Sequence, residues 1–196
     1  MQAGIVSQLP DGPRIAARVG EVLDVARRAG VRIFFTRHLS LPIEVAGVGA
    51  LRAAMAWQHR DSAGQVVAPF PRDSPQFQIV SELTPRPSEA ICDKITMSAF
   101  TGTFLDIALR DCGIRTFLIA GIAVEVGIEP TVRHATDLGY FPIIVTDACG
   151  HGNADAAQRA LESLVFAGGS IQTDIAAMRA ALDTTTPALE PNSTQS

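Results

Sequence analysis

Residues 119–140 combine an apolar run with closely spaced glycines and then polar residues at helical spacing. We read this segment as a buried strand that ends at Gly121, a tight crossover, and a helix that opens near Gly127. Free backbone N–H groups and a helix N-terminus would then face the carboxyl edge of a sheet, where anions and oxyanions are stabilised. A reactive side chain is expected at position 127, but the residue there is glycine.

The elements that must position this segment alternate between strand and helix patterns without hairpin turns. Strands are expected at residues 31–36, 91–95, 116–120, 142–146 and 170–173. Helices are expected from Asp11, as the N-cap, to Gly30, and at 50–58, 103–112, 130–138, 154–166 and 175–182. In the helix at 103–112, we expect Phe104, Ile107 and Ala108 to face inward. This alternation predicts an α/β fold: a three-layer, doubly wound, Rossmann-like parallel sheet with helices on both faces.

The length of 196 residues fits one domain, which we place at residues 1–183, followed by a Thr/Pro/Ser-rich tail at 184–196 that we expect to be disordered. The net charge of −4 and the absence of a long Lys/Arg cluster argue against nucleic acid as a partner. The apolar run at 117–124 is too short to span a bilayer, and no signal-peptide pattern is visible. We therefore expect a cytoplasmic protein.

Two segments carry a family pattern. In the first, Lys94 is followed by Ser98, Phe100, Thr103 and Leu105. In the second, the pattern positions are Gly121, Thr131, Arg133, Ala135 and Gly139. Together, and in this order, these segments resemble the isochorismatase-like hydrolase superfamily, which includes nicotinamidases, N-carbamoylsarcosine amidohydrolases and isochorismatases. The resemblance extends to about residue 175.

The resemblance implies a catalytic Asp, Lys and Cys. The Lys corresponds to Lys94, and the Cys corresponds to Gly127. The Asp ends the first strand in relatives, and it would stand one residue before Met1 here. We therefore expect a first strand upstream of Met1, with a rearranged sheet as the alternative.

Isochorismatases within this superfamily also carry a non-cysteine residue, commonly Gly, at the position of Gly127. They cleave a vinyl ether by protonating the enol carbon and adding water. We therefore expect non-thiol, acid-and-water hydrolysis of a small carboxylated metabolite. One alternative is a catalytically degenerate member that only binds a ligand. Another is a C–N amide hydrolase with a displaced nucleophile at Cys92 or Cys149, although small buried residues are the commoner role of such cysteines.

Other residues enter the site through the same resemblance. Ile122 and Ala123 occupy the position of a cis peptide, where backbone groups of Ile122, Ala123 and Gly127 would stabilise an oxyanion; an ordinary trans turn is the alternative. Lys94 is expected to be partly buried, with a lowered pKa. The substrate-binding candidates are Gln2, Arg37, His38, Trp57, Phe100 and Glu125.

Each of these candidates has a plainer role to weigh. Arg37 could bind a carboxylate bidentately. Trp57 and Phe100 could form aromatic walls, or they could belong to the core. Glu125 could replace the missing acid or serve structure only. No metal-ligand spacing is visible, so we expect no metal and no cofactor, and relatives suggest a homo-oligomer, either a dimer or a tetramer.

Overall fold

Parallel strands form the centre of the protein in a computed structural model that describes residues 1–183. The strands are β1 (Phe34–His38), β2 (Ala90–Lys94), β3 (Thr116–Ile122), β4 (Phe141–Gly150) and β5 (Ile171–Thr173). β1 pairs with β2 in one sheet, and β3, β4 and β5 pair in that order in another. Every one of these pairings is parallel. The expected tail at 184–196 lies outside the described residues.

Helices connect successive strands, as a parallel arrangement requires. They are α1 (Ala3–Val6), α2 (Gly12–Arg28), α3 (Val48–Gln58), α4 (Leu105–Asp111), α5 (Glu129–Asp137), α6 (Ala154–Phe166) and α7 (Ile175–Asp183). Short 3₁₀ turns occur at Ile43–Val45, Ala63–Gln65, Pro75–Phe77 and Ser81–Leu83. A π-helical turn, Val124–Ile128, joins β3 to α5.

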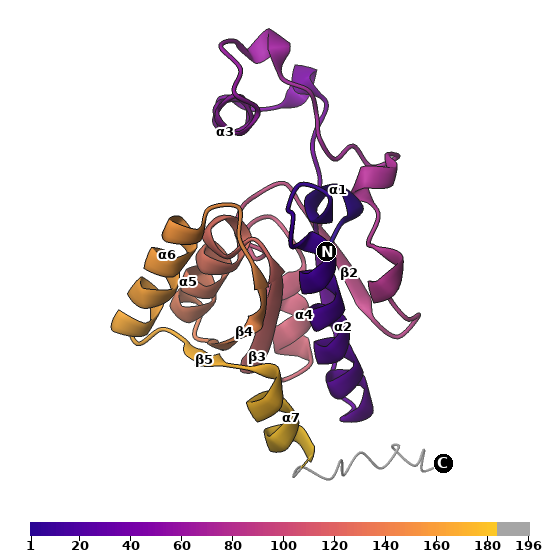
Figure 1. Ribbon diagram of the computed structural model, residues 1–196, viewed down its shortest axis with the longest axis vertical. Coiled ribbons are helices and arrows are strands. Elements are labelled where there is room, and N and C mark those ends of the chain that lie inside the picture. The colour runs from indigo at the N-terminus through magenta and orange to yellow at the C-terminus, as the bar shows by residue number, and fades with distance from the viewer. Residues whose placement is uncertain (184–196) are drawn as a thin grey trace.

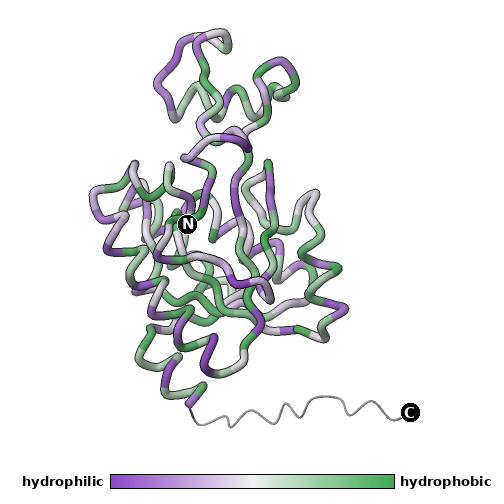
Figure 2. Tube along the Cα trace, turned by 90° about the vertical axis from the view of Figure 1, so that its right-hand side faces the viewer, coloured by the Kyte–Doolittle hydropathy of each residue, from purple (hydrophilic) through white to green (hydrophobic). Residues whose placement is uncertain are grey.

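Helices cover both faces of the strands, which confirms the expected α/β class (Figure 1). On one face, α2 and α7 pack around a core that includes Leu23, Val145 and Met178. On the other face, α4 and α5 enclose a second core that includes Leu109 and Ala135. Hydrophobic segments run through this body of the molecule in Figure 2.

The segment that carries α3 extends away from this body (Figures 1 and 2). None of the residues of α3 is buried, and Val48 and Trp57 are 75% and 53% exposed. An isolated helix of 11 residues is marginally stable in water, so α3 depends on the loops that hold it.

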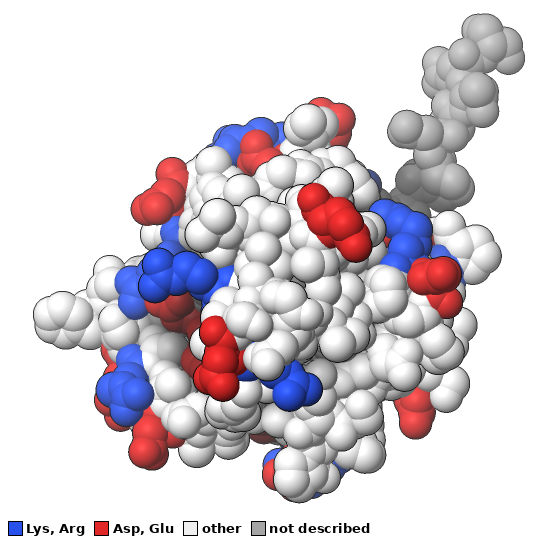
Figure 3. All heavy atoms as spheres, turned by 90° about the horizontal axis from the view of Figure 1, so that it is seen from above, with Lys and Arg blue, Asp and Glu red and all other residues white. Residues whose placement is uncertain are grey.

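Seen from above, charged residues of both signs are scattered over a largely uncharged surface on this face (Figure 3).

Several local expectations need correction. The strand expected from residue 31 begins at Phe34, because the backbone N–H of Val31 bonds back to Ala26 and closes the end of α2. Asp11 stands at the N-cap of α2, but its side chain makes no cap bond and pairs with Arg14 instead.

The inward face of α4 also differs from the expectation. Phe104 and Ile107 are 46% and 64% exposed, whereas Leu105 and Leu109 are buried. The remaining helices and strands lie within a few residues of the expected positions, and α6 spans the expected residues Ala154–Phe166.

Candidate active site

The carboxyl ends of three strands converge on one large cavity of about 1180 Å³. His38 ends β1, Lys94 ends β2 and Ile122 ends β3, and all three residues line the cavity. Ligands of open α/β sheets bind beyond the carboxyl ends of the strands, so this is the expected place for a site. The same cavity continues between β1 and β3 toward the amino ends of these strands.

Lys94 is held at the floor of this site by the loop that follows it. Its Nζ donates hydrogen bonds to the carbonyl oxygens of Thr96 at 2.8 Å and Met97 at 2.7 Å. Burial lowers the pKa of Lys94 to about 8, because desolvation disfavours the ammonium form. An ammonium group has three donors, so one N–H remains for a ligand. The expected lowering of the Lys94 pKa is therefore confirmed.

The turn after β3 has the backbone geometry that the resemblance implies. The Ile122–Ala123 peptide bond is cis. The backbone N–H groups of Val126, Gly127 and Ile128 all point at the carbonyl oxygen of Ala123, at 3.3, 2.9 and 3.2 Å. The expected oxyanion role of the Gly127 N–H therefore needs correction, because this donor is already used within the π-helical turn.

Gly127 lines the cavity, and nothing crowds it. A Cβ built at this position would have no heavy atom within 4 Å. The hydroxyl of Thr131 donates to the Gly127 carbonyl at 2.6 Å, and this bond fixes the backbone without filling the space. The position has room for a side chain that the sequence does not supply.

Glu125 brings a carboxylate to the same wall. Its Oε1 accepts hydrogen bonds from the backbone N–H groups of Gly152 at 2.7 Å and Asn153 at 2.8 Å. Its Oε2 is buried and has no hydrogen-bond partner. Glu125 therefore ties the turn after β4 to the site with one oxygen and keeps the other unpaired.

His38 and Trp57 complete the walls that the sequence predicted. Burial, with the nearby Lys94 charge, lowers the pKa of His38 to about 4, so this ring is neutral at pH 7. Trp57 reaches the cavity from α3, beside Ala56 and His59. One wall of the site is thus carried by the segment that extends away from the body of the molecule.

Sequence comparison shows which family this arrangement belongs to. Residues 1–176 match the Isochorismatase domain family. The chain belongs to the isochorismatase family.

Relatives of the isochorismatase family with a named activity align with most of this chain, but with a smaller share of their own length. Ureidoacrylate amidohydrolase RutB of Pseudomonas syringae pv. syringae is 32% identical over 157 residues, which are 76% of this chain and 62% of that protein. RutB of Methylorubrum extorquens is 31% identical over 179 residues, covering 87% of this chain and 71% of that one. The chain thus spans less than two thirds of the Pseudomonas relative.

Solved isochorismatase-family structures share the fold over most of the chain. An isochorismatase family protein from Burkholderia thailandensis has a TM-score of 0.73 at 28% identity, covering 93% of this chain and 91% of that one. A second one, from Desulfovibrio vulgaris, has a TM-score of 0.74 at 24% identity, covering 93% and 94%. The latter likeness shows the fold alone.

Two expected substrate-binding residues have other partners in this isochorismatase-family chain. Arg37 makes a bidentate ion pair with Asp93, at 2.7 and 3.1 Å, and its guanidinium lies 4.2 Å from the ring centre of Phe77. Phe100 is 6% exposed and stacks on Tyr140 at 5.5 Å within the second core. Neither residue lines the cavity. Phe100 takes the core role that the sequence left open, and a substrate contact by Arg37 stays a prediction.

Gln2 lines the cavity, but its side chain is already engaged. Its amide exchanges two hydrogen bonds with the backbone of His38, and the residue is 2% exposed. Its role in contacting a ligand is therefore limited to the part of the side chain that these bonds leave free.

The candidate displaced cysteines do not reach the site. Cys92 is fully buried in the core beneath α4, and it does not line the cavity. The thiol of Cys149 donates to the carbonyl of Val145 at 3.1 Å, and burial raises its pKa to about 12. A thiol in that state is a poor nucleophile, because the thiolate is the reactive form.

Some residues of the site gave no sequence signal of their own. Met97 and Asn153 line the cavity, and they come from two separate loops. The Thr/Ser-rich stretch after Lys94 contains Met97 and was the one hint in the sequence that this loop belongs to the site. The same stretch supplies Ser98, whose hydroxyl lies 2.9 Å from Nδ1 of His134. The ring of His134 also packs there against Phe100.

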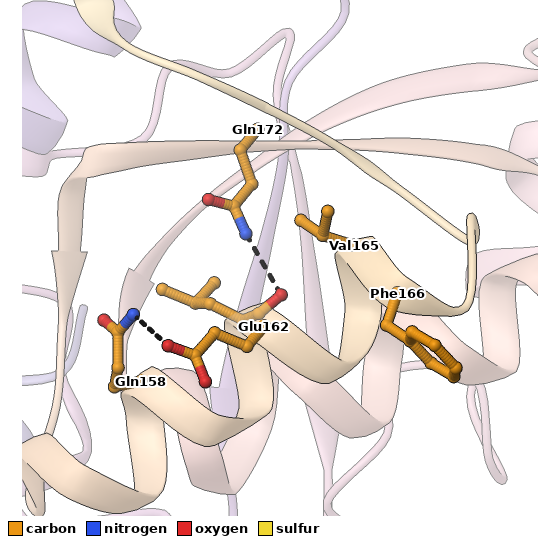
Figure 4. Close-up of a pocket in the computed structure, with 6 residues that line it drawn as sticks. Gln158, Glu162, Val165, Phe166 and Gln172 are labelled. Carbon is orange, nitrogen blue, oxygen red and sulfur yellow. Dashed lines mark hydrogen bonds between the residues drawn. The ribbon is translucent and has the colours of Figure 1, made fainter.

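A second, shallower hollow of about 320 Å³ lies on the outer surface between α6 and β5 (Figure 4). Its polar groups are paired, with Gln158 donating to Glu162 at 2.8 Å and Gln172 donating to the carbonyl of Leu161 at 3.1 Å. Phe166 points outward and is 94% exposed. The hollow offers one carboxylate and no convergent hydrogen-bond donors. The cavity at the strand ends is therefore the better candidate for an active site.

Over residues 1–183, no group of three or more His, Cys, Asp or Glu side chains is arranged to hold a metal ion. Over the same residues, no helix is long and apolar enough to cross a membrane.

Proposed function

We propose that this protein is a hydrolase of a small carboxylated metabolite that works without a thiol nucleophile. Membership of the isochorismatase family and the amidohydrolase names of its curated relatives support hydrolysis as the reaction class. The observation that carries the non-thiol reading is the open, side-chain-free position at Gly127, together with the absence of any cysteine among the cavity-lining residues that the structure describes.

The reaction that fits such a site is hydrolysis of a vinyl ether. A carboxylic acid protonates the enol carbon, and water adds to the resulting oxocarbenium carbon and loses a proton. The hemiketal formed in this way then breaks its C–O bond, releasing an alcohol and a carbonyl compound. No step needs a covalent bond to the protein, so a glycine at position 127 is compatible with every step.

The reaction needs a carboxylic acid that protonates the enol carbon. We propose an aspartate one residue before Met1, as the family resemblance implies. Glu125 is the one carboxylate that lines the cavity within residues 1–183, and its unpaired Oε2 makes it the substitute. Glu125 stands two residues before Gly127, and both residues line the cavity.

Lys94 would bind the substrate carboxylate or hold the acid. Its pKa of about 8 leaves the ammonium form dominant at pH 7. A charged donor that is partly buried, as Lys94 is, binds a carboxylate more strongly than an exposed lysine does.

A C–N amide hydrolase is the second candidate, and the similarity to ureidoacrylate amidohydrolases favours it. It would need Cys92 or Cys149 as the nucleophile. The burial of Cys92 and the raised pKa of Cys149 count against it. A member that binds a ligand without turnover is the third candidate.

A substrate panel separates these candidates. We expect turnover of a carboxylated vinyl ether such as isochorismate, and unchanged turnover after treatment with iodoacetamide. Turnover of ureidoacrylate that iodoacetamide abolishes would establish the C–N hydrolase. Thermal stabilisation by either compound without turnover would establish the degenerate member.

We also propose a homo-oligomer. The exposed apolar side chains of α3, Val48 and Trp57 among them, support burial against a second copy. Sedimentation equilibrium would give a dimer or tetramer mass, and a monomer at micromolar concentration would contradict it.

A further inference from the structure

Lys94 is the only lysine among the 16 Lys and Arg residues of the chain. Its ammonium group is compact, whereas the planar guanidinium of an arginine presents its donors in a fixed fork. The carbonyl oxygens that hold Nζ, those of Thr96 and Met97, both belong to residues 95–104, which connect β2 to α4 and which we call the lysine loop. The position of this amine therefore depends on what fixes the lysine loop.

Hydroxyl groups within the lysine loop shape it from inside. The hydroxyl of Thr96 lies 2.9 Å from the carbonyl oxygen of Ser98 and 3.0 Å from that of Thr101. The hydroxyl of Thr103 donates to the carbonyl of Ala99 at 2.6 Å. These bonds join the loop only to itself, so they do not fix it relative to the strands.

Two side chains of α5 join the lysine loop to the body of the molecule. The hydroxyl oxygen of Thr131 accepts a hydrogen bond from the backbone N–H of Ala99 at 3.0 Å. Nδ1 of His134 lies 2.9 Å from the hydroxyl of Ser98. Residues three apart are neighbours on a helix surface, so one face of α5 carries both contacts.

The two contacts differ in burial. Thr131 and Ala99 are each 3% exposed. His134 is only half-buried, and a second hydroxyl, that of Thr101, lies 3.4 Å from the same Nδ1. Water does not reach two buried groups to replace a lost bond between them, so the loss leaves a donor unsatisfied. The bond from Ala99 to Thr131 is therefore the firmer anchor of the lysine loop.

The hydroxyl of Thr131 also joins the lysine loop to the turn at Gly127. It donates its one proton to the carbonyl of Gly127 at 2.6 Å, and it accepts from Ala99 with a lone pair. Hydrogen bonds linked in this way polarise one another, so each is stronger than it would be alone. A serine hydroxyl can form the same pair of bonds, whereas a valine, which has the shape of threonine, can form neither.

The anchor is close to the lysine amine along the chain. One residue separates the N–H of Ala99 from the carbonyl of Met97, which accepts from Nζ of Lys94 at 2.7 Å. The residues of this series of contacts all line the main cavity: Lys94, Met97, Ala99, Gly127 and Thr131. A shift of the lysine loop at Ala99 would therefore move a carbonyl group that holds the amine.

We propose that Thr131 is a positioning residue, which holds Lys94 in place relative to the turn at Gly127 through the lysine loop. The inference deepens the proposed function, because it rests on Lys94 as the group that binds the substrate carboxylate. Without the Thr131 hydroxyl, the N–H of Ala99 loses its buried partner, and the carbonyl of Met97 shifts with it. The amine of Lys94 then becomes more hydrated and holds a carboxylate in a different place.

Three variants separate positioning from a general loss of stability. Thr131→Val removes the hydroxyl and keeps the shape of the side chain, and Thr131→Ser keeps the hydroxyl. Thr136→Val is the matched control on the same helix, because the hydroxyl of Thr136 also bonds to the carbonyl four residues earlier, that of Val132 at 3.0 Å. Its other partner is the carbonyl of Gly169, which is not part of the lysine loop.

The pKa of the Lys94 amine is a readout that needs no substrate. Because the chain has one lysine, labelling lysine with ¹⁵N at Nζ gives one signal, which is titrated by NMR. Burial lowers this pKa to about 8 in the unsubstituted protein. We expect the same pKa in Thr131→Ser and Thr136→Val, and a pKa of about 9 or higher in Thr131→Val, because hydration favours the ammonium form. An unchanged pKa in Thr131→Val would overturn the proposal.

Amide exchange in the unsubstituted protein tests the anchor even if Thr131→Val does not fold. The N–H of Ala99 should exchange at least about 100-fold more slowly than that of Gly102, an exposed residue of the same loop. Equal exchange at the two positions would also overturn the proposal.

Kinetics with isochorismate separate this inference from the proposed function. We expect the KM to be about tenfold higher for Thr131→Val than for the unsubstituted protein, and to be restored by Thr131→Ser. Turnover by Thr131→Val with an unchanged KM would contradict the positioning role. If no form of the protein turns over isochorismate, the proposed function fails, and the pKa comparison still decides the role of Thr131.

Discussion

The side-chain amide of Gln2 makes both hydrogen bonds to the backbone of His38 that a neighbouring strand would make. Its Nε2 donates to the His38 carbonyl at 2.9 Å, and its Oε1 accepts from the His38 N–H at 2.6 Å. The last open position of β1 is thereby closed by a side chain, while Phe34 and Thr36 before it line the main cavity. The residue that precedes the helix α1 thus caps the edge beside the candidate site.

Replacing Gln2 with Ala should lower the free energy of unfolding by about 2–3 kcal/mol, because a buried donor and a buried acceptor on His38 both lose their partner. Denaturant unfolding measures this loss. Gln158→Ala is the matched control, since its amide bonds to Glu162 on the exposed surface of α6. Equal losses for the two variants would contradict the strand-like role of Gln2.

Gly127 and Gly150 make a second matched pair. Gly127→Ala places a methyl group in open space within a helical turn, so we expect the free energy of unfolding to change by less than about 1 kcal/mol. Gly150→Ala places its methyl group 2.8 Å from Cγ1 of Ile122 and 3.3 Å from Cγ1 of Ile15. We expect this variant to lower the free energy of unfolding by about 1–3 kcal/mol. If Gly127→Ala were the more damaging change, position 127 would not be open.

His38 should make stability fall in acid. Its pKa is about 4 in the folded protein, below the usual 6.5, so the unfolded chain binds a proton that the folded protein excludes. The free energy of unfolding should therefore fall as the pH drops from 6.5 to 4, and level off below that as far as His38 is concerned. Relative to His38→Asn, the unsubstituted protein should lose about 3 kcal/mol between pH 7 and pH 4. A constant difference between the two proteins over this range would show that His38 keeps its ordinary pKa.

Lys94 should set an alkaline limit on ligand binding. Because its pKa is about 8, the ammonium form is lost as the pH rises through 8. The KM for a carboxylated substrate should then rise about tenfold between pH 7 and pH 9, while a Lys94→Gln variant should show a high KM with no such rise. Lys94→Arg keeps the charge at both pH values and should remove the rise as well. The same pH dependence in all three proteins would exclude Lys94 from binding the carboxylate.

The sequence predicted the order of the strands and of every helix except α1, because many apolar runs begin or end beside a glycine, as at Gly30, Gly121 and Gly139. The sequence did not predict which face of a helix is buried where apolar side chains occur on more than one face. In α4, the residues Leu105, Ile107 and Leu109 allow more than one inward face, and packing against the strands selects Leu105 and Leu109.

The candidate site was predictable only in part. Lys94, His38 and Gly127 follow directly from strand ends, where parallel sheets concentrate ligand contacts. The ion pair of Arg37 was not predictable, because it depends on the pairing of β1 with β2, whose register sets Arg37 opposite Asp93. The core role of Phe100 stayed one of two alternatives, because the sequence could not show that Phe117 and Tyr140 converge on it.

Hydrolysis that needs no thiol is the central claim. The most direct measurement is kcat/KM for a carboxylated vinyl ether, compared between the unsubstituted protein and a variant with Cys92→Ala, Cys112→Ala and Cys149→Ala, with thermal unfolding as the control for folding. We predict values that agree within about threefold. A folded variant that retains less than about 1% of the activity would show that a cysteine performs the chemistry, and it would contradict the account.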